Sequence, residues 1–574
     1  MKKASFLLFS LLLAIFIGCQ KEDIDQPFPA EKDREFDNGS SIDFPELNEQ
    51  LVINLELLGR IWGFLKYHHP AVGEGKYHWD YELFRVLPKY MKVKNNEERD
   101  KIILDWINKY GKIPTCSTCK ETSYNSFIKP DLLWAENSNM NNGLKEKIKE
   151  IYKNRYQGDH YYIRMIKDVG IPEFIHEYSY SNMSYPDAGF RLLSLYRYWN
   201  IIHYFYPDKY LAEKDWNDVL KEYIPLFISA ENRLEYELVT LKIIVDICDS
   251  HAYLPISVFK GNNNAPFRVW FIEKKLVVTD YYNPQLIETK GLKIGDIITH
   301  INGETVESIV ENLKKYYPAS NDARKLHDIS FDLFRSNNYS IAINYISSGL
   351  SSQKEIRLYD RSTISTYSWY VDKNSKCYKF INDSIGYITI ATITIDDIPI
   401  IKETFKKAKG IIIDIRNYPP IKPSMHISSS LGSWISGGPY FVKFSYGNTD
   451  NPGEFKFQPA QITYSSETFQ GKVMVLVNEI TLSAAEFFAM TFRAGINTKI
   501  IGSRTAGALG FVSSIILPGG LQTQFTGIGY YYPDGTPTQR FGIVPDIWVE
   551  PTVEGIRQGR DELMDMAIKL INEE

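Results

Sequence analysis

The chain of 574 residues lacks the motifs by which several enzyme classes are recognised. It contains no glycine-rich phosphate loop, no H-E-x-x-H zinc motif and no dinucleotide-binding fingerprint. Its formal net charge is only −5, which gives no electrostatic reason to expect a nucleic-acid partner. These absences argue against an NTPase, a zinc protease and a nucleic-acid-binding protein, and we expect neither a cofactor nor a metal.

Long hydrophobic runs are also scarce. Phe6–Ile17, which follows two lysines, is too short for a stable membrane span and has the layout of a secretory signal. A glycine and Cys19 come next and resemble the cleavage box of bacterial lipoproteins, so we expect residues 1–19 to be a lipoprotein signal peptide and Cys19 to carry the lipid. An ordinary signal peptide with an incidental cysteine is the alternative. Residues 20–45 are polar and acidic, which predicts a flexible tether.

A chain of this length is too long for one core and predicts about three or four domains. Two N-terminal segments, about 52–90 and 189–227, look like copies of each other. Six residues recur at a constant offset of 137, namely Arg60 and Arg197, Trp62 and Trp199, Tyr67 and Tyr204, Pro70 and Pro207, Trp79 and Trp216, and Pro88 and Pro225. We expect residues 46–260 to be a helical region built on this internal repeat.

Two sequence features could suggest a metal, and neither is strong. Cys116 and Cys119 form a lone C-x-x-C with no second pair at zinc spacing, so a local disulfide or two buried thiols are the alternatives. His68 and His69 lie in the first copy of the repeat, but the second copy has phenylalanine and tyrosine at the matching positions. Structural packing is therefore the favoured interpretation of the histidines.

Residues 265–360 are expected to form a PDZ-like β domain. Within them, Gly291–Val306 alternates apolar residues around two glycine turns and looks like the central hairpin of PDZ domains. Such domains bind an extended peptide tail by strand addition at a sheet edge. The usual carboxylate-binding loop is not visible, and Pro266–Trp270 is the segment that could take its place.

The pattern from Cys377 onward alternates strands and helices. We predict strands at Ser384–Ile393, Gly410–Ile415, Val473–Val477 and Lys499–Ile501 and a helix at Asp397–Lys407. This alternation predicts a mixed sheet with helices packed against it over residues 370–574. Functional residues in such domains lie at the carboxyl ends of the strands.

Ser483 is the strongest candidate for a catalytic residue. The strand Val473–Val477 is followed by a polar turn, and Ser483 then opens a segment with helical spacing. Unpaired N–H groups at a helix start favour developing negative charge, which suits a nucleophilic serine. The alternative is that Ser483 is only an N-cap, with Glu486 completing a capping box.

A candidate general base precedes the PDZ-like segment. Tyr236–Ile247 is apolar at helical spacing and runs into Asp249, Ser250 and His251. A histidine, with an ordinary pKa near about 6.5, can take a serine proton at neutral pH. A partly buried structural histidine would give the same local pattern.

Six motifs occur in the order seen in one family, and the chain resembles the serine peptidases that include the C-terminal processing proteases and the tricorn core protease. The motifs are Asp249–His251, the PDZ signature, Asp414–Arg416, Asn478 to Glu486, Gly502–Gly507 and Gly542–Asp546. The resemblance extends from about Glu235 to the C-terminus. It implies a multidomain α/β fold in which the last domain is ClpP/crotonase-like.

The resemblance also implies roles for individual residues. Processing proteases carry a catalytic lysine in a T-x-G-K run, but Thr505–Gly507 is followed here by Ala508, so that dyad is absent. Tricorn-like members use a Ser-His pair ahead of the PDZ region. On that pattern, Ser483 is the nucleophile, His251 its base and Ser250 an accessory hydroxyl.

The sequence departs from the family at two places. Gln539 stands where tricorn-like enzymes have a glutamate that orients the histidine, and Asp534 is a possible substitute. Pro419–Pro420 follows the Asp-Ile-Arg run where the family has glycines that serve the oxyanion hole. Proline has no N–H, so we expect the donors to be Ile421 and Ala484.

Together these patterns predict a serine endopeptidase of the bacterial cell envelope, in the outer membrane and held by its lipid anchor, that cleaves peptides or unfolded protein tails. The alternative is a catalytically inactive relative that binds such tails. A third interpretation, glycan binding by the N-terminal region, rests only on the 39 tyrosines and 31 phenylalanines.

Overall fold

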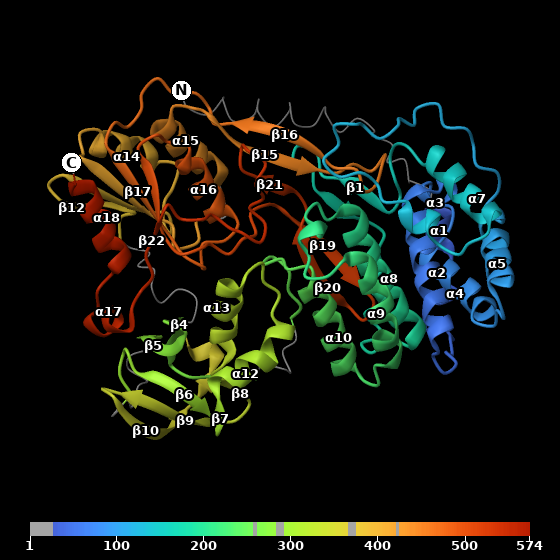
Figure 1. Cartoon of the computed structure of the whole chain (residues 1–574), viewed down its shortest axis with the longest axis horizontal. Helices are drawn as coiled ribbons and strands as arrows, with labels where there is room; N and C mark the ends of the chain where they lie inside the picture. The colour runs from blue at the N-terminus through green and yellow to red at the C-terminus, as the bar shows by residue number, and fades with distance from the viewer. Residues whose placement is uncertain (1–26, 256–260, 283–291, 365–374, 421–423, 574) are drawn as a thin grey trace, which may run out of the picture.

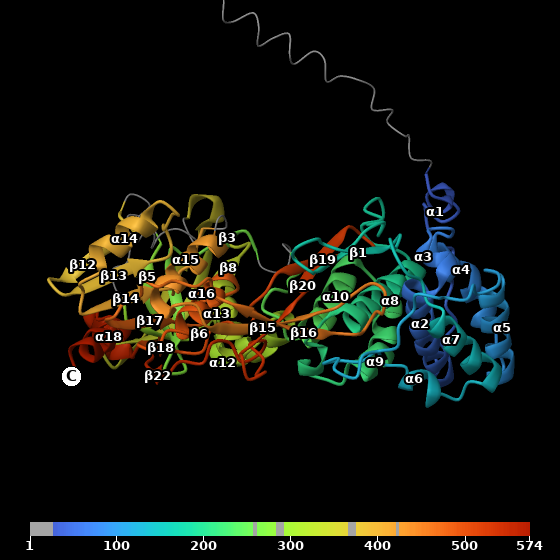
Figure 2. The ribbon, with the colours of Figure 1, turned by 90° about the horizontal axis from the view of Figure 1, so that it is seen from above.

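The structure is a computed structural model of the chain. It describes residues 27–255, 261–282, 292–364, 375–420 and 424–573. The molecule is elongated: N-terminal helices form one end, a C-terminal α/β domain forms the other, and a β domain lies beside the α/β domain (Figures 1 and 2). The coarse expectation of a multidomain mixed α/β protein is confirmed.

The N-terminal region is built mainly from long helices around a single core rich in aromatic side chains. Its longer helices are α2 (Glu49–His68), α4 (Trp79–Tyr90), α5 (Asn96–Asn108), α7 (Asn142–Lys153), α8 (Ala188–Phe205), α9 (Trp216–Ser229) and α10 (Arg233–Asp246). Its short elements are α1 (Pro29–Lys32), α3 (Pro70–Gly73), α6 (Leu133–Glu136), η1 (Lys209–Leu211) and the two-stranded sheet of β1 (Ile163–Met165) and β2 (Pro172–Phe174).

The same tryptophan pair occurs in both predicted copies. In the first, Trp62 Nε1 donates to the Trp79 carbonyl at 3.1 Å and Trp79 Nε1 donates back to the Trp62 carbonyl at 2.9 Å. In the second, Trp199 and Trp216 make the same reciprocal bonds at 2.8 and 3.1 Å. Each pair joins one helix to the next. Helices α2 and α8 each end two residues before their proline, so one residue lies between the helix and the proline.

The residues that could have suggested a metal have other partners. Cys116 and Cys119 are joined by a disulfide. His68 is buried, stacks on Phe64 and donates from Nδ1 to the Phe64 carbonyl at 2.9 Å, and burial lowers its pKa to about 3. His69 accepts the Ala71 N–H at the start of α3. Within the described ranges no group of three or more His, Cys, Asp or Glu residues is arranged to hold a metal ion.

The β domain covers the segment predicted to be PDZ-like. Its main sheet has the order β10-β9-β6-β5-β4, with β4 at one edge and α13 packed beside it. Its elements are β3 (Asn263–Asn264), β4 (Phe267–Ile272), β5 (Lys275–Tyr281), β6 (Ile297–Ile301), β7 (Glu304–Thr305), α12 (Val306–Leu313), η3 (Lys314–Tyr316), α13 (Asp322–Asp332), β8 (Arg335–Ser336), β9 (Ser340–Ser347), β10 (Leu350–Arg357), β11 (Tyr359–Asp360) and η4 (Arg361–Thr363).

The α/β domain contains a six-stranded sheet of order β12-β13-β14-β17-β18-β22, parallel except for its edge strand β12. Its elements are β12 (Tyr378–Asn382), β13 (Ile385–Thr389), α14 (Asp397–Phe405), β14 (Gly410–Asp414), α15 (Ser424–Ser436), β15 (Tyr440–Tyr446), β16 (Lys456–Gln461), β17 (Lys472–Val477), α16 (Ala484–Arg493), β18 (Thr498–Gly502), β19 (Val512–Leu517), β20 (Leu521–Thr526), β21 (Gly529–Tyr531), β22 (Ile547–Trp548), α17 (Val553–Gln558) and α18 (Glu562–Asn572). All four predicted strands and the predicted helix are present.

Helices cover both faces of this sheet because its central strands are apolar on both sides. On β14, Ile411 and Ile413 pack toward α14, α15 and α16, whereas Ile412 packs toward α18.

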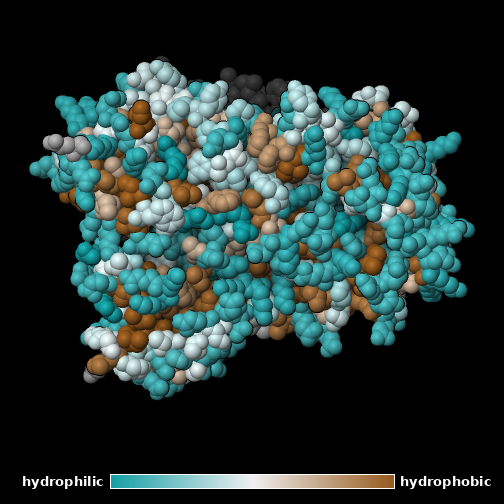
Figure 3. Space-filling view, viewed as in Figure 1, coloured by the Kyte–Doolittle hydropathy of each residue, from teal (hydrophilic) through white to brown (hydrophobic). Residues whose placement is uncertain are grey.

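In the space-filling view of the same side as Figure 1, the exposed hydrophobic residues form separate patches divided by hydrophilic ones (Figure 3). None of the described helices is long and apolar enough to span a bilayer.

A hairpin from the C-terminal domain completes the helical core. Strands β19 and β20 pair with each other, and Ile515, Leu517 and Phe525 on them belong to the same buried cluster as the N-terminal helices. The hairpin lies against α8 and α10 (Figure 1). Its apolar side chains therefore fix the helical region, and the loop that follows α10, relative to the α/β domain.

Candidate functional site

Ser483 lies between strand β17 and helix α16, as predicted. Its backbone has φ +56° and ψ −115°, a combination rarely adopted by a residue with a Cβ. Ordinary N-caps of this chain, such as Asn141, Asp187 and Asn232, have negative φ and accept a helix N–H. Because the surrounding structure holds Ser483 in a strained conformation, the residue has the geometry of a nucleophile on a sharp strand-to-helix turn.

Glu486 holds this turn through hydrogen bonds. Its buried carboxylate accepts the Ser483 N–H at 3.0 Å, as in a capping box, and also the N–H groups of Gly507 and Ala508 at 2.8 and 3.1 Å. The Thr505 hydroxyl is a fourth donor, at 2.5 Å. Burial raises the pKa of this carboxyl, and the four hydrogen bonds oppose that effect.

The motifs that are distant in sequence meet at this point. The Thr505 side-chain oxygen, which donates to Glu486, also accepts the Ile543 N–H at 2.6 Å. The Ser250 hydroxyl donates to the Ala506 carbonyl at 2.8 Å. The nucleophile turn, the Thr505 loop, the Gly542 run and the Asp249–His251 segment are thus connected by hydrogen bonds.

A cavity of about 490 Å³ opens beside Ser483. Its wall is mostly apolar and aromatic, with Leu482, Phe487, Phe488, Leu509, Phe511, Val512 and Tyr530 among the lining residues. Ser483, Ala484 and His251 line the same cavity. The structure therefore brings the predicted nucleophile and the predicted base to one cavity, although they are 232 positions apart in the sequence.

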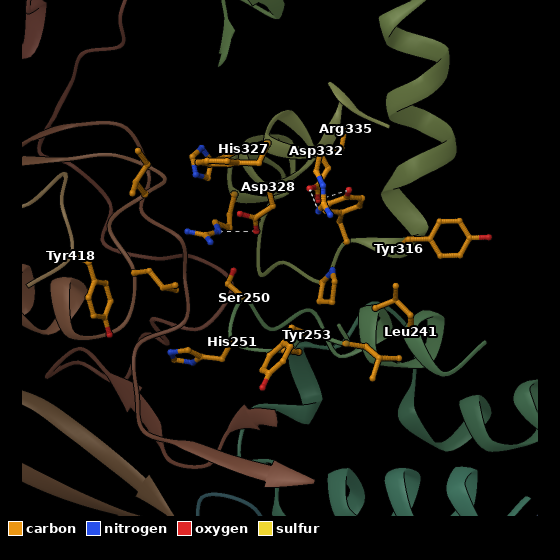
Figure 4. Close-up of a pocket in the computed structure, with 18 of the residues that line it drawn as sticks. Leu241, Ser250, His251, Tyr253, Tyr316, His327, Asp328, Asp332, Arg335 and Tyr418 are labelled. Carbon is orange, nitrogen blue, oxygen red and sulfur yellow. Dashed lines mark hydrogen bonds and ion pairs between the residues drawn. The ribbon is translucent and has the colours of Figure 1, made fainter. Parts of the chain in front are cut away.

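A second cavity, of about 530 Å³, adjoins the first and shares His251, Tyr418 and Leu482 with it. Helix α13 of the β domain forms one of its walls. Figure 4 shows the His251 imidazole pointing toward Tyr418, with Asp328, Asp332 and Arg335 across the space. Asp328 accepts a hydrogen bond from Arg324, and Asp332 accepts one from Arg335. Together the two cavities are lined by residues of the helical region, the β domain and the α/β domain, and Ser483 lines the first of them.

His251 is buried, and only one of its ring nitrogens has a partner. Nδ1 lies 2.8 Å from the Thr526 hydroxyl and 3.8 Å from the Asp249 carboxylate. Nε2 is buried with no hydrogen-bond partner among the described residues. Burial lowers the pKa of His251, Asp249 opposes this, and Arg324 adds to it. The lowered pKa favours the neutral imidazole, in which one nitrogen can accept a proton.

The hydrogen bonds of Ser250 go to residues other than the nucleophile. Its hydroxyl donates to Ala506 and accepts the Ser320 N–H at 2.8 Å, and the Ser250 N–H donates to the Ser320 hydroxyl at 2.9 Å. These bonds join the segment carrying His251 to the Thr505 loop and to the β domain. The Ser250 hydroxyl, predicted to be an accessory group in catalysis, therefore links these segments through hydrogen bonds.

Gln539 and Asp534 lie away from the His251 ring. The buried Gln539 amide donates to Tyr206, to the Cys248 carbonyl and to Ser320, at 3.1 to 3.4 Å. Asp534 is exposed in a turn and accepts the Thr536 N–H at 2.9 Å. Neither residue bonds the imidazole, so the expectation that one of them orients His251 is corrected: that contact is made by Thr526, at the end of β20.

The two predicted oxyanion donors differ in what the structure says of them. Ala484 is the first residue of α16 and lines the cavity beside Ser483, and its N–H is one of those that a helix start leaves without an intrahelical acceptor. Ile421 falls outside the described residues, as does Cys19. Sequence patterns gave no signal for Thr526, and they drew attention to Asp249 only as a neighbour of His251.

Residues 384–549 match the family model of Peptidase family S41. A protein of Chlamydia trachomatis serovar D, described only as "Protein", is 34% identical over 103 residues, which are 17% of this chain and 17% of that protein. The tricorn protease of Thermoplasma acidophilum is 27% identical over 127 residues, 22% of this chain and 12% of the protease. The aligned segments thus span less than a fifth of these relatives.

Solved structures show the same fold. The crystal structure of mature CPAF superimposes with a TM-score of 0.53 and 14% sequence identity, covering 67% of this chain and 98% of that chain. A complex of mature CPAF with lactacystin gives a TM-score of 0.52 at 13% identity, with the same coverage. At this level of identity, the likeness concerns the fold alone.

Proposed function

We propose, on the match of residues 384–549 to the model of Peptidase family S41, that the protein is a serine endopeptidase with Ser483 as nucleophile and His251 as general base. The single observation that carries the proposal is the cavity that Ser483, Ala484 and His251 line together. The strained φ of Ser483 and the unpartnered Nε2 of His251 give it further support.

In the proposed reaction, the Ser483 oxygen attacks a peptide carbonyl while His251 Nε2 takes the hydroxyl proton. The Ala484 N–H donates to the oxyanion of the tetrahedral intermediate. When the C–N bond breaks, the leaving amine receives the proton from His251, and the acyl group remains on Ser483. Water, deprotonated by His251, then hydrolyses this ester and restores the serine.

The 490 Å³ cavity beside Ser483 supports a preference for a large apolar side chain next to the scissile bond. We expect unstructured peptides with Phe or Leu at that position to be cleaved about 10- to 100-fold faster, by kcat/KM, than the same peptides with Asp, because a buried carboxylate would find an apolar wall. A peptide series that differs at this one position, read by mass spectrometry, measures the preference. Equal cleavage of all members would contradict it.

A second candidate function is the binding of peptide tails without cleavage, through a PDZ-like β domain. Strand β4 is at a sheet edge beside α13, and a cavity of about 500 Å³ there is lined by Trp270, Phe271, Ile272 and Leu326. These features fit strand addition by an extended peptide.

We also propose that the helical region arose by duplication. The reciprocal tryptophan pairs, which recur in both copies of the repeat, support this origin.

We also propose that the protein is a lipoprotein of the bacterial cell envelope, anchored through Cys19. Changing Cys19→Ala should move the protein from the membrane to the soluble fraction, since a stable anchor needs more than one acyl chain and that variant would carry none. Fractionation followed by immunoblotting measures this, with Cys377→Ala as the matched control because Cys377 is a buried thiol of the α/β domain. Continued membrane association of Cys19→Ala would rule out the anchor.

A further inference from the structure

A chain of three hydrogen-bonded groups lies behind the proposed base. The Thr526 hydroxyl is 2.8 Å from His251 Nδ1 and 2.9 Å from Asp249 Oδ1. The carboxylate itself is 3.8 Å from Nδ1, too far for a direct hydrogen bond. The threonine hydroxyl therefore stands between the imidazole and the carboxylate.

The direction of each bond follows from counting protons. A carboxylate only accepts, so the single hydroxyl proton of Thr526 is donated to Asp249. The contact with His251 must then run from Nδ1–H to a lone pair of the same hydroxyl. A neutral imidazole with its proton on Nδ1 has a free electron pair on Nε2, and that atom is buried without a partner among the described residues.

We propose that Thr526 and Asp249 are positioning residues that hold His251 in the Nδ1–H tautomer, so that Nε2 serves as the base for Ser483. The inference rests on the proposed peptidase function. During catalysis, a proton moves from Ser483 to Nε2 and then from Nε2 to the leaving amine, while the protons on Nδ1 and on the Thr526 hydroxyl stay where they are. The positive charge on the imidazolium is then stabilised by Asp249 through the intervening hydroxyl.

The three hydrogen-bonded groups are held in place because the Asp249 carboxylate accepts further hydrogen bonds from the backbone. Its carboxylate also accepts the Thr526 N–H at 2.5 Å and the His251 N–H at 2.9 Å, and both Asp249 and Thr526 are fully buried. Thr526 ends strand β20, whose apolar residues pack in the helical core. The hairpin thus places Thr526 beside His251. Through Thr526, the buried Asp249 carboxylate supports the imidazole, although position 539 holds an amide.

Thr526→Val tests the inference, because it removes the hydroxyl and keeps the shape. We expect kcat for an unstructured peptide to fall by about 10²-fold or more, below the roughly 10⁴-fold cost of losing a direct carboxylate partner in another triad, with KM little changed. Thr526→Ser should recover most of the rate. Thr523→Val is the matched control: Thr523 lies on the same strand, is fully buried, and its hydroxyl has no partner among the residues that the structure describes, so the rate should not change.

A spectroscopic measurement separates positioning from folding. In ¹⁵N-histidine NMR spectra, the His251 signal, identified by its loss in His251→Gln, should report the Nδ1–H tautomer in wild type and lose that signature in Thr526→Val. In a pH profile, Asp249→Asn should move the acid limb of kcat/KM to lower pH. The reason is that Asp249 raises the pKa of His251, whereas Arg324, which faces it from α13, lowers that pKa.

The outcomes distinguish this inference from the peptidase proposal. If wild type cleaves peptides and Thr526→Val retains the wild-type kcat, or if wild-type His251 carries its proton on Nε2, the positioning role is overturned while the peptidase stands. If wild type cleaves nothing and no serine-directed phosphonate labels it, the peptidase proposal fails, and the catalytic role of this chain of bonds fails with it.

Discussion

Ser483→Ala is expected to reduce kcat for an unstructured peptide by about 10⁶-fold, the loss that follows removal of the nucleophile in another serine peptidase. Ser250 cannot replace it, because the Ser250 hydroxyl is bonded to the Ala506 carbonyl. KM should change little, since the nucleophile acts mainly in the transition state. Steady-state kinetics measure the loss. Labelling by a serine-directed phosphonate, mapped to Ser483 by mass spectrometry, should also disappear.

Two further substitutions show whether this effect is chemical. Ser445→Ala is a matched control, because Ser445 is buried on β15 and its hydroxyl has no partner in the described structure; it should leave the rate unchanged. Ser483→Gly should be as inactive as Ser483→Ala yet more stable by about 1 kcal/mol, since glycine adopts positive φ without strain. If wild type neither cleaves nor reacts with the phosphonate, and binds peptide tails as well as Ser483→Ala does, the tail-binding function is the correct one.

His251→Gln is expected to reduce kcat by about as much as Ser483→Ala does, because glutamine fills a similar space but cannot accept the proton from Ser483. Members of a catalytic unit are not additive, so the double variant of Ser483 and His251 should be no slower than either single variant. Steady-state kinetics with the same unstructured peptide measure kcat for all three variants. Losses that add up in the double variant would show that the two residues do not act together.

The pH profile gives an independent test of the base. Burial and Arg324 lower the pKa of His251, and Asp249 raises it; the net effect is a pKa below its ordinary value of 6.5. Because the base works only when neutral, the acid limb of kcat/KM should lie below pH 6.5. Arg324→Gln should move this limb to higher pH by removing a positive charge. A limb above pH 6.5 in wild type would contradict the assignment of His251.

Local sequence patterns predicted much of the fold. The apolar runs Gly410–Ile415 and Val473–Val477 became the central parallel strands β14 and β17, since a strand covered on both faces needs apolar residues at every position. The turn before α16 was also identified, because a polar segment there separates an apolar strand from residues with helical spacing. The helix α10 that precedes His251 was identified because its apolar residues recur at helical spacing.

The residues around the proposed nucleophile could be named from the order of the motifs, but their connections could not. Glu486 was recognised as a capping residue, and the structure adds that its carboxylate also binds Thr505, Gly507 and Ala508. Gln539 stood at a position where a carboxylate was expected to orient His251, yet its amide faces Tyr206 and Ser320. The order of motifs identifies which segments meet, whereas the path of the backbone decides which atoms face each other.

The sequence by itself determined the strand, turn and helix around Ser483, the helix that delivers His251, and the absence of a lysine after Gly507, because each depends on neighbours within one or two turns of chain. Only the tertiary structure decided what supports His251. Thr526 is 275 residues away, on a hairpin held by apolar packing in the helical core. A single hydroxyl leaves no periodic or compositional trace in a sequence, so its role depends on where hydrophobic burial places its strand.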